Sequence, residues 1–449
     1  MMKRNLSNIQ VWLLVFFLLS CRQSSMDKAD GPAVIDFLPQ IGNYQKVPVS
    51  EFVSELEYIP LETGDNCLIG EDVSVSRRNV IVTKSHILVA AQRYCYAFGR
   101  DGKFITEIGR FGQGPGEYTV IGNNGIFVDE KEQSLYMEIL PFAILEYSWD
   151  GVFRQSIKLP TNTLGLYPDG VFFVRDSLFI GHNANQSGNE EYHFFLFDTS
   201  GQIIKTFDNH VKIARSGISW NSFENAMKPF RLSDRIYVKE KPNDTLYCLN
   251  EHDELIPQFV FNLGKYAYTK EKRANSSVEG LMEGLESVLI IPFQNMVGAS
   301  NYIFFDIDPN RLNIPLPKGR ARKGESQPLP LPPGTVIIRT YKRDNPVVFP
   351  HGIYDTVNQM TRLLDSDPVS GFRGLINDLD GGLSFWPLYC NSDNELIDIQ
   401  EAHTMKEYLT DEYFAAHEIK NPQAHQKLKE LLKTLQDDDN PVIVVAKLK

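Results

Sequence analysis

The sequence predicts an all-β fold, a six-bladed β-propeller with a short C-terminal helical insertion in the last blade. The first observation is a repeated unit in which two strand-forming segments flank a tight turn, as at Asp101-Gly102. The second is its spacing, because the turn positions Gly102, Gly151, Gly201 and Asp253 follow one another at 49, 50 and 52 residues. A repeat of about 50 residues with only β content in each copy is typical of propeller blades.

Composition agrees with this fold class. The chain has 449 residues, of which 42% are hydrophobic and 11% aromatic, and this is ample for a large buried β core. The formal net charge of −12 argues against nucleic acid or anionic lipid headgroups as the main partner, since both attract clustered cations. The charge does not exclude a neutral ligand.

The repeat sets the expected blades. The first four are predicted at residues 72–109, 126–159, 170–207 and 221–264. The fifth blade carries two insertions, an amphipathic helical segment at 276–287 and a proline-rich, basic segment at 313–334. Asn358 then takes the place that Gly201 has in the third blade. We interpret the long interval before Asn358 as one blade with both insertions rather than two blades, which gives six.

The C-terminal region predicts how the ring closes. Asn421 and Pro422 are the N-cap and first residue of a helix whose apolar face includes Leu428. The apolar segment 442–448 is expected to be a strand of the last blade, paired there with the N-terminal segment 56–61. A strand this apolar has to be buried beside other strands.

A glycine-rich segment, 109–118, follows the first blade. Gly112, Gly114 and Gly116 have the spacing of a phosphate-binding loop, but that motif must lead into a helix, and a strand pattern follows here. We therefore expect a loop between blades, with glycines at positive φ.

The N-terminus indicates export and lipid anchoring. Residues 1–20 combine a basic start with an apolar run too short to span a bilayer, and no other stretch comes near the ~20 apolar residues required. Cys21 directly follows this run and a serine, which resembles the lipobox of bacterial lipoproteins; an ordinary cleaved signal is the alternative. We expect Cys21 to be lipidated, 21–45 to be a polar tether and 46–449 to be the propeller.

Four further cysteines, Cys67, Cys95, Cys248 and Cys390, are expected to be buried free thiols. Cys95 and Cys248 lie in opposite blades and are too far apart for a disulfide. Cys390 could meet Cys67 or Cys95, because the last blade adjoins the first, so the disulfide state stays open at this point.

Two segments hold candidate ligand-binding residues. Asn183, Asn185 and Gln186 lie in a polar loop of the third blade, where amides could bind sugar hydroxyls or a peptide backbone. A solvated hairpin loop is the alternative.

The other segment contains Asn377, Asp378, Asp380 and Trp386. Its two acids resemble the start of a calcium loop, although the glutamate that would complete one is missing, and a structural turn is the alternative. If local side chains bind a metal, these acids are the candidates; no other cofactor is predicted.

In combination, these segments resemble a known family. Residues 56–63, 112–118, 377–382 with 385–387, and 440–449 look like those of the six-bladed, NHL-like β-propeller lipoproteins of the Bacteroidota, which are often encoded beside outer-membrane nutrient-uptake genes. The resemblance implies the fold and an envelope location, most simply the outer membrane, without fixing the membrane side. It implies no activity and no catalytic residues.

Two functions remain open, and we favour the first. The propeller of an anchored envelope lipoprotein binds a glycan, a peptide or a partner protein without catalysis, as an accessory to nutrient uptake. Alternatively, an axial site makes it a hydrolase or lyase acting on saccharides or peptides, which three or more acids or histidines at one channel mouth would favour. No local catalytic motif is present.

Overall fold

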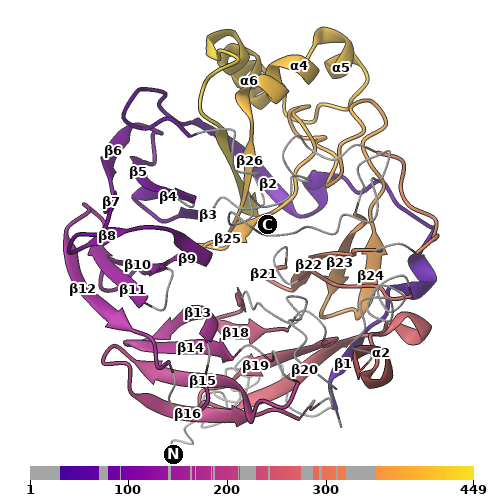
Figure 1. Cartoon of the computed structure of the whole chain (residues 1–449). Helices are drawn as coiled ribbons and strands as arrows, with labels where there is room; N and C mark the ends of the chain where they lie inside the picture. The colour runs from indigo at the N-terminus through magenta and orange to yellow at the C-terminus, as the bar shows by residue number, and fades with distance from the viewer. Residues whose placement is uncertain are drawn as a thin grey trace, which may run out of the picture.

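Six small antiparallel sheets form a ring around a central axis (Figure 1). The computed structural model describes residues 31–69, 79–91, 93–139, 143–161, 164–166, 168–183, 185, 188–210, 212, 229–240, 243–274, 287–292, 296–309, 312–319 and 349–449. The predicted six-bladed β-propeller is therefore confirmed, and the long interval before Asn358 belongs to a single blade.

The first three blades each consist of four consecutive strands. The first blade contains β3 (Asn79–Val82), β4 (His86–Ala91), β5 (Tyr94–Gly99) and β6 (Phe104–Glu107). The second contains β9 (Ile121–Asp129), β10 (Ser134–Ile139), β11 (Ala143–Ser148) and β12 (Phe153–Lys158). The third contains β13 (Pro168–Arg175), β14 (Leu178–Asn183), β15 (Tyr192–Asp198) and β16 (Ile203–Asp208).

The fifth blade keeps this plan, whereas the fourth and the sixth add a strand from the N-terminal part of the chain. The fourth has β17 (Phe230–Leu232), β18 (Arg235–Val238), β19 (Thr245–Leu249) and β20 (Leu255–Phe261), plus β1 (Ala33–Ile35) at its edge. The fifth has β21 (Val297–Ala299), β22 (Tyr302–Asp306), β23 (His351–Asp355) and β24 (Met360–Leu363). The sixth has β25 (Tyr389–Cys390), β26 (Glu395–Gln400), β27 (Val442–Leu448) and β2 (Val53–Pro60).

The ring closes through the two ends of the chain, as predicted. C-terminal β27 pairs antiparallel with N-terminal β2 on one side and with β26 on the other. Between β26 and β27 the chain forms α4 (Ala402–Tyr408), α5 (Asp411–Ala415) and α6 (Pro422–Thr434), which pack outside the last blade (Figure 1). The side chain of Asn421 caps α6 by accepting from the Ala424 amide, also as predicted.

The tether prediction fails for its second half. Residues 33–45 belong to the folded domain, because β1 pairs in parallel with β20 and both Ile35 and Phe37 are fully buried between the fourth and fifth blades. Short 3-10 helices follow at Leu38–Gln40 and Val49–Glu51. Three strand residues are too few to give a recognisable sequence pattern, and their partner lies more than 200 positions away in the chain.

The insertions of the fifth blade are only partly described. A 3-10 helix (Gly264–Tyr266) and α2 (Lys270–Ala274) precede the predicted helix at 276–287, of which only Ser287 lies within the described residues. The proline-rich insertion leaves the sheet between β22 and β23, and its residues 313–319 form neither helix nor strand.

The turns repeat as predicted, with one shift. Gly102, Gly151, Gly201 and Asp253 all have positive φ. In the fifth blade the positive φ belongs to Gln359 rather than Asn358, because the turn there holds four residues between Asp355 and Met360.

The glycine-rich segment is a loop between the first two blades, as expected. Its strands β7 (Arg110–Phe111) and β8 (Glu117–Tyr118) pair in parallel. The Glu117 carboxylate accepts from the Gly114 amide at 2.7 Å, so it takes a donor that a phosphate loop would offer to its ligand. Gly109 and Gly116 have positive φ, whereas Gly112 and Gly114 do not.

The core lies between the blades. Successive strand side chains point to opposite faces of a sheet, so each blade buries both faces against its neighbours. Six separate hydrophobic clusters occupy the six junctions between neighbouring blades. All four described cysteines are free, which confirms the prediction of free thiols. None of the helices among the described residues is long and apolar enough to span a membrane.

Candidate functional site

A pocket of about 870 Å³ lies on the propeller axis. The innermost strands of all six blades line it, and we call it the axial pocket. Its lining comprises residues 79–81 and 84, 127–131, 172–176, 229–231 with 233 and 234, 296–300, and 388–392 with 394. Because β3, β9, β13, β17, β21 and β25 are edge strands of their sheets, they turn unpaired backbone donors and acceptors towards this space.

The turns that follow the innermost strands form the mouth of the pocket. Asp176, Ser177, Ser233 and Asp234 have positive φ, which is the geometry of tight hairpin turns between neighbouring antiparallel strands. Equivalent turns in other blades contribute polar residues such as Lys84. The fold therefore gathers polar side chains from six distant segments at one end of the axis.

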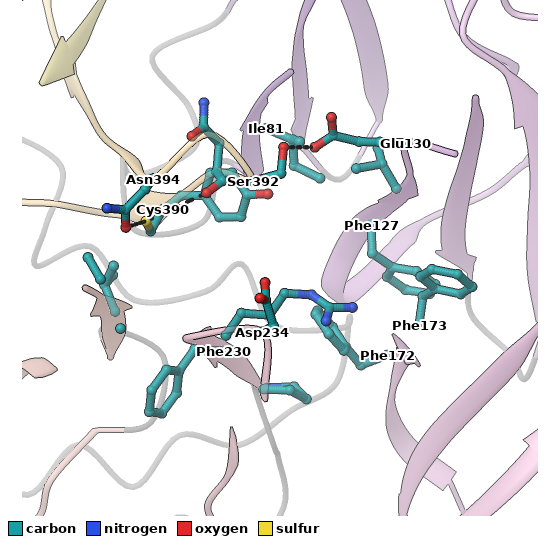
Figure 2. Close-up of a pocket in the computed structure, with 18 of the residues that line it drawn as sticks. Ile81, Phe127, Glu130, Phe172, Phe173, Phe230, Asp234, Cys390, Ser392 and Asn394 are labelled. Carbon is teal, nitrogen blue, oxygen red and sulfur yellow. Dashed lines mark hydrogen bonds between the residues drawn. The ribbon is translucent and has the colours of Figure 1, made fainter. Parts of the chain in front are cut away.

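Several aromatic side chains form part of the walls (Figure 2). Phe127 comes from the second blade, and Phe172 and Phe173 come from the third. The ring centroids of Phe127 and Phe172 lie 5.9 Å apart. Phe230 and Tyr389 lie on the fourth and sixth blades. Phe172 and Tyr389 are only half-buried, so apolar ring surface faces the pocket.

Ion pairs fix most charges at the mouth. Lys84 contacts Asp393 at 3.3 Å, Lys131 contacts Asp176 at 3.3 Å, and Arg175 contacts Asp253 at 2.5 Å. A further bond crosses the mouth, where the Ser392 hydroxyl donates to Glu130 at 2.6 Å (Figure 2).

The remaining charged groups of the lining are Asp129, Asp234 and Arg231. Asp129 accepts from the backbone amides of Lys131 and Glu132 at 3.0 and 3.3 Å. Arg231 donates to the carbonyl of Val174 at 2.8 Å.

Two lining groups have raised pKa values. Burial, followed by the charge of Glu130, raises the pKa of the Tyr389 phenol well above its ordinary value. Burial and the charge of Glu395 raise the pKa of the Cys390 thiol to about 12. Both groups are therefore protonated at neutral pH.

The structure places the predicted amides away from this pocket. Asn183 and Asn185 are buried. Asn183 donates to the carbonyl of Tyr192 at 2.8 Å, and Asn185 accepts from Asn209 at 3.3 Å. Both side chains hold the end of β14 in place. Gln186 lies outside the described residues, as does Cys21.

The carboxylates of the second predicted segment also bond to other groups of the protein. Asp380 accepts from Tyr58, Asn377 and the Gly382 amide at 3.0, 2.7 and 2.9 Å. Asp378 pairs with Lys420 at 2.6 Å and also accepts from the hydroxyl and amide of Ser50.

These contacts bear on the calcium interpretation. Both carboxylates already accept bonds from protein donors, and they bind the loop to β2 and to the segment before α6. Among the described residues, no three His, Cys, Asp or Glu side chains are close enough to hold one metal ion. The calcium interpretation stays a prediction.

Trp386 lies at the junction of the fifth and sixth blades. Its ring stacks on His351 with centroids 3.9 Å apart and an interplanar angle of 7°, and it also contacts Phe304. The Trp386 side chain is almost fully buried, so it serves as a packing residue in this structure.

Sequence reasoning did not identify the residues of the axial pocket. Superimposing the repeats offers a signal that could have found them, because the turn after the innermost strand recurs in every blade and brings polar residues to the same end of the axis. Four of the six innermost strands are short, however: β3 has four residues, β17 and β21 have three each, and β25 has two.

A likeness to a solved structure supports the fold. A predicted exported protein from Bacteroides fragilis aligns with a TM-score of 0.59 at 16% identity, covering 93% of this chain and 99% of that one. At this identity the likeness extends to the fold alone.

Two further likenesses are weaker. A DUF4221 family member from Bacteroides vulgatus has a TM-score of 0.41 at 9% identity, covering 88% of this chain and 97% of its own. Virginiamycin B lyase from Staphylococcus aureus has a TM-score of 0.33 at 10% identity, covering 56% of this chain and 69% of its own. Neither bears on function. No functionally curated protein has a matching sequence.

The family assignment rests on a match along nearly the whole described domain. The model of the family "Domain of unknown function (DUF4934)" matches residues 32–447. This range begins just before β1 and ends within β27, so it includes both strands that close the ring. The chain therefore belongs to the DUF4934 family.

Proposed function

We propose that this protein is a lipid-anchored envelope protein that binds a ligand in its axial pocket without catalysis, as an accessory to nutrient uptake. The pocket itself is the observation that carries the proposal. A volume of about 870 Å³ lies within the range of known ligand sites and would accommodate a short peptide or a glycan fragment.

The lining suits such a ligand. The half-buried rings of Phe172 and Tyr389, from the third and sixth blades, offer flat apolar surface, on which sugar rings and apolar side chains pack. The inner-edge backbone groups offer donors and acceptors for hydroxyls or peptide groups. Apolar walls with a few polar groups are the usual composition of a binding pocket.

Two of the lining groups with nucleophilic atoms, Cys390 and Tyr389, are poorly suited to catalysis. A thiol with a pKa of about 12, as Cys390 has, holds almost no thiolate at neutral pH. The phenol of Tyr389 is equally reluctant to ionise, because burial raises its pKa. These properties favour binding.

One observation favours the enzyme alternative, a hydrolase or lyase. Four carboxylates line the mouth, Asp129, Glu130, Asp176 and Asp234. Three of them already accept hydrogen bonds within the protein: Asp129 from a backbone amide, Glu130 from Ser392, and Asp176 from Lys131. We therefore place binding first and let product analysis decide.

The lipid anchor is the second part of the proposal. Its support is the order of an apolar run, Ser20 and Cys21 in the sequence. The likeness to an exported Bacteroides protein agrees with an envelope location. Metabolic labelling with a radioactive fatty acid tests it, because Cys21→Ser should abolish both the label and membrane fractionation.

A thermal-shift screen of residues 22–449 against glycan fragments and short peptides tests the binding function. Ser392→Trp places a large ring in the mouth, and Ser200→Trp makes the same change in an exposed hairpin turn outside the lining. A ligand that stabilises the wild type and Ser200→Trp, but not Ser392→Trp, and is recovered intact supports binding in the pocket. Recovery of a cleaved product establishes the enzyme instead.

A further inference from the structure

We infer that the axial pocket selects an amphipathic ligand with an anionic group, a carboxylate or sulfonate held by Arg231, and that its apolar part packs on the phenylalanine walls. The inference rests on the proposed function, since it names the ligand class of the same pocket.

Arg231 lines the axial pocket. It lies on β17, the innermost strand of the fourth blade, and its Nη2 donates to the carbonyl of Val174 on β13 at 2.8 Å. The residue is exposed, and partial burial lowers the pKa of its guanidinium against the opposing charges of Asp234 and Asp129.

Arg231 also differs from the other cations of the lining. Lys84, Lys131 and Arg175 each contact a carboxylate, at 3.3, 3.3 and 2.5 Å. Within the described part of the chain, no carboxylate lies in ion-pair contact with Arg231. An anion that enters the pocket displaces water from around this cation, and the attraction between the two charges grows as less water screens them.

The guanidinium keeps donors available for such an anion. An arginine carries five N–H donors in a planar fork, and Arg231 uses one of them on Val174. A carboxylate or sulfonate can accept two parallel bonds from such a fork. The bond to Val174 fixes one end of the group, so less side-chain entropy is lost when the anion binds.

The walls specify the rest of the ligand. Phe127, Phe172, Phe173 and Phe230 line the same pocket, from three adjacent blades (Figure 2). Phe127, Phe173 and Phe230 are almost fully buried, whereas Phe172 and Tyr389 are half-buried and keep exposed ring surface. Removing such surface from water stabilises an apolar group by about 25 cal/mol per Å². Among the described lining residues, the pocket thus combines one cation without a carboxylate partner with an apolar wall, which matches an amphipathic anion.

Two carboxylates oppose this attraction and provide a test. Asp129 accepts from two backbone amides, which spreads its charge. Asp234 lies three residues after Arg231 in the exposed turn at the mouth, and within the described residues it makes no ion pair or hydrogen bond. Because Asp234 repels anions, Asp234→Asn should strengthen anion binding.

Two fluorescent probes that differ by one sulfonate test the inference. 8-Anilinonaphthalene-1-sulfonate is anionic, and N-phenyl-1-naphthylamine is its neutral counterpart. Arg231→Met should weaken the sulfonate probe by roughly 10-fold or more, since a charged hydrogen bond is lost, and should leave the neutral probe within roughly 2-fold. Arg235→Met makes the same change at an exposed position of the neighbouring strand β18, outside the lining, and should alter the affinity of neither probe.

Each outcome separates this inference from the proposed function. If both probes bind, Ser392→Trp excludes them and Arg231→Met leaves the sulfonate probe unchanged, the pocket binds ligands but does not select anions. If Ser392→Trp and Ser200→Trp do not differ for either probe, both proposals fail. Should Arg231→Met not fold, Asp234→Asn decides, because an unchanged sulfonate affinity in that variant overturns the inference.

Discussion

The Nε2 atom of His182 lies 3.2 Å from Oε1 of Glu240, joining the third blade to the fourth. The other ring nitrogen, Nδ1, lies 2.5 Å from Asp169, and His193 also contacts Glu240 at 3.1 Å. His182 is fully buried. The buried carboxyl group of Glu240 and the half-buried one of Asp169 favour the charged form of the imidazole, so the junction between these blades includes a buried ion pair.

The first prediction is a pH-dependent stability from this cluster. Burial disfavours the charged form of His182, but Asp169 and Glu240 outweigh burial and raise its pKa from 6.5 to about 10. Burial likewise opposes ionisation of Glu240, yet His182 and His193 lower its pKa from 4.5 to about 2. The contribution of His182 to the free energy of unfolding is present below pH 6.5 and is lost as the pH rises towards 10. The contribution of Glu240 is present above pH 4.5 and is lost as the pH falls towards 2.

Melting temperatures of wild type and His182→Gln across this range measure the effect. The variant should lose about 3–5 kcal/mol at pH 6, because it leaves buried carboxylates uncompensated. The deficit should shrink towards pH 10. His252→Gln makes the same change at an exposed position and should follow the wild type. Parallel pH profiles for His182→Gln and wild type would show that the cluster contributes nothing to the pH dependence.

The second prediction concerns the seam between the last and first blades. The Asn440 side chain donates to the carbonyls of Glu62 and Cys67 at 2.6 and 2.8 Å and accepts from the Ile69 amide at 2.8 Å. Asn440→Ala leaves these backbone groups unpaired in a buried place, so it should cost about 2–4 kcal/mol. Urea unfolding measures the loss, and exposed Asn43→Ala is the control. Equal midpoints for the two variants contradict a role in ring closure.

The third prediction concerns the thiols. All four described cysteines are free, and burial raises the pKa of Cys95, Cys248 and Cys67 as well as that of Cys390. Ellman's reagent should find four thiols in residues 22–449 after unfolding without a reductant, and it should react slowly with the native protein at pH 7. Two thiols instead of four would reveal a disulfide.

Local patterns made the fold predictable. The turn glycines recur because a hairpin that needs positive φ tolerates few other residues, and this constraint shows directly in the sequence at Gly102, Gly151 and Gly201. The N-cap Asn421 and the closing strand β27 were likewise predictable, since capping chemistry and uninterrupted apolar character are both local signals.

The site was not predictable in the same way, because it consists of single residues from six blades. Asn183 and Asn185 have the residue type of a binding loop, yet their amides bond within the protein, and residue type does not distinguish these two uses. Arg231 is one of 45 basic residues, and only the ring places it on the axis. β1 was missed because its stability comes from a distant parallel partner.

The last prediction tests the contact between the first blade and β2 of the sixth blade. Gly102 has φ +80°, and a Cβ atom there would overlap the carbonyl oxygen of Pro60 in β2. Gly165 has φ +69° with open space around it, so Gly165→Ala introduces backbone strain alone, about 1–2 kcal/mol. Gly102→Ala adds the steric overlap, which should cost about 1–3 kcal/mol more because two packed blades must separate. Urea unfolding of both variants measures the difference. If the two variants are equally destabilised, a Cβ atom at residue 102 does not clash with β2, and the stability of the ring does not depend on this contact.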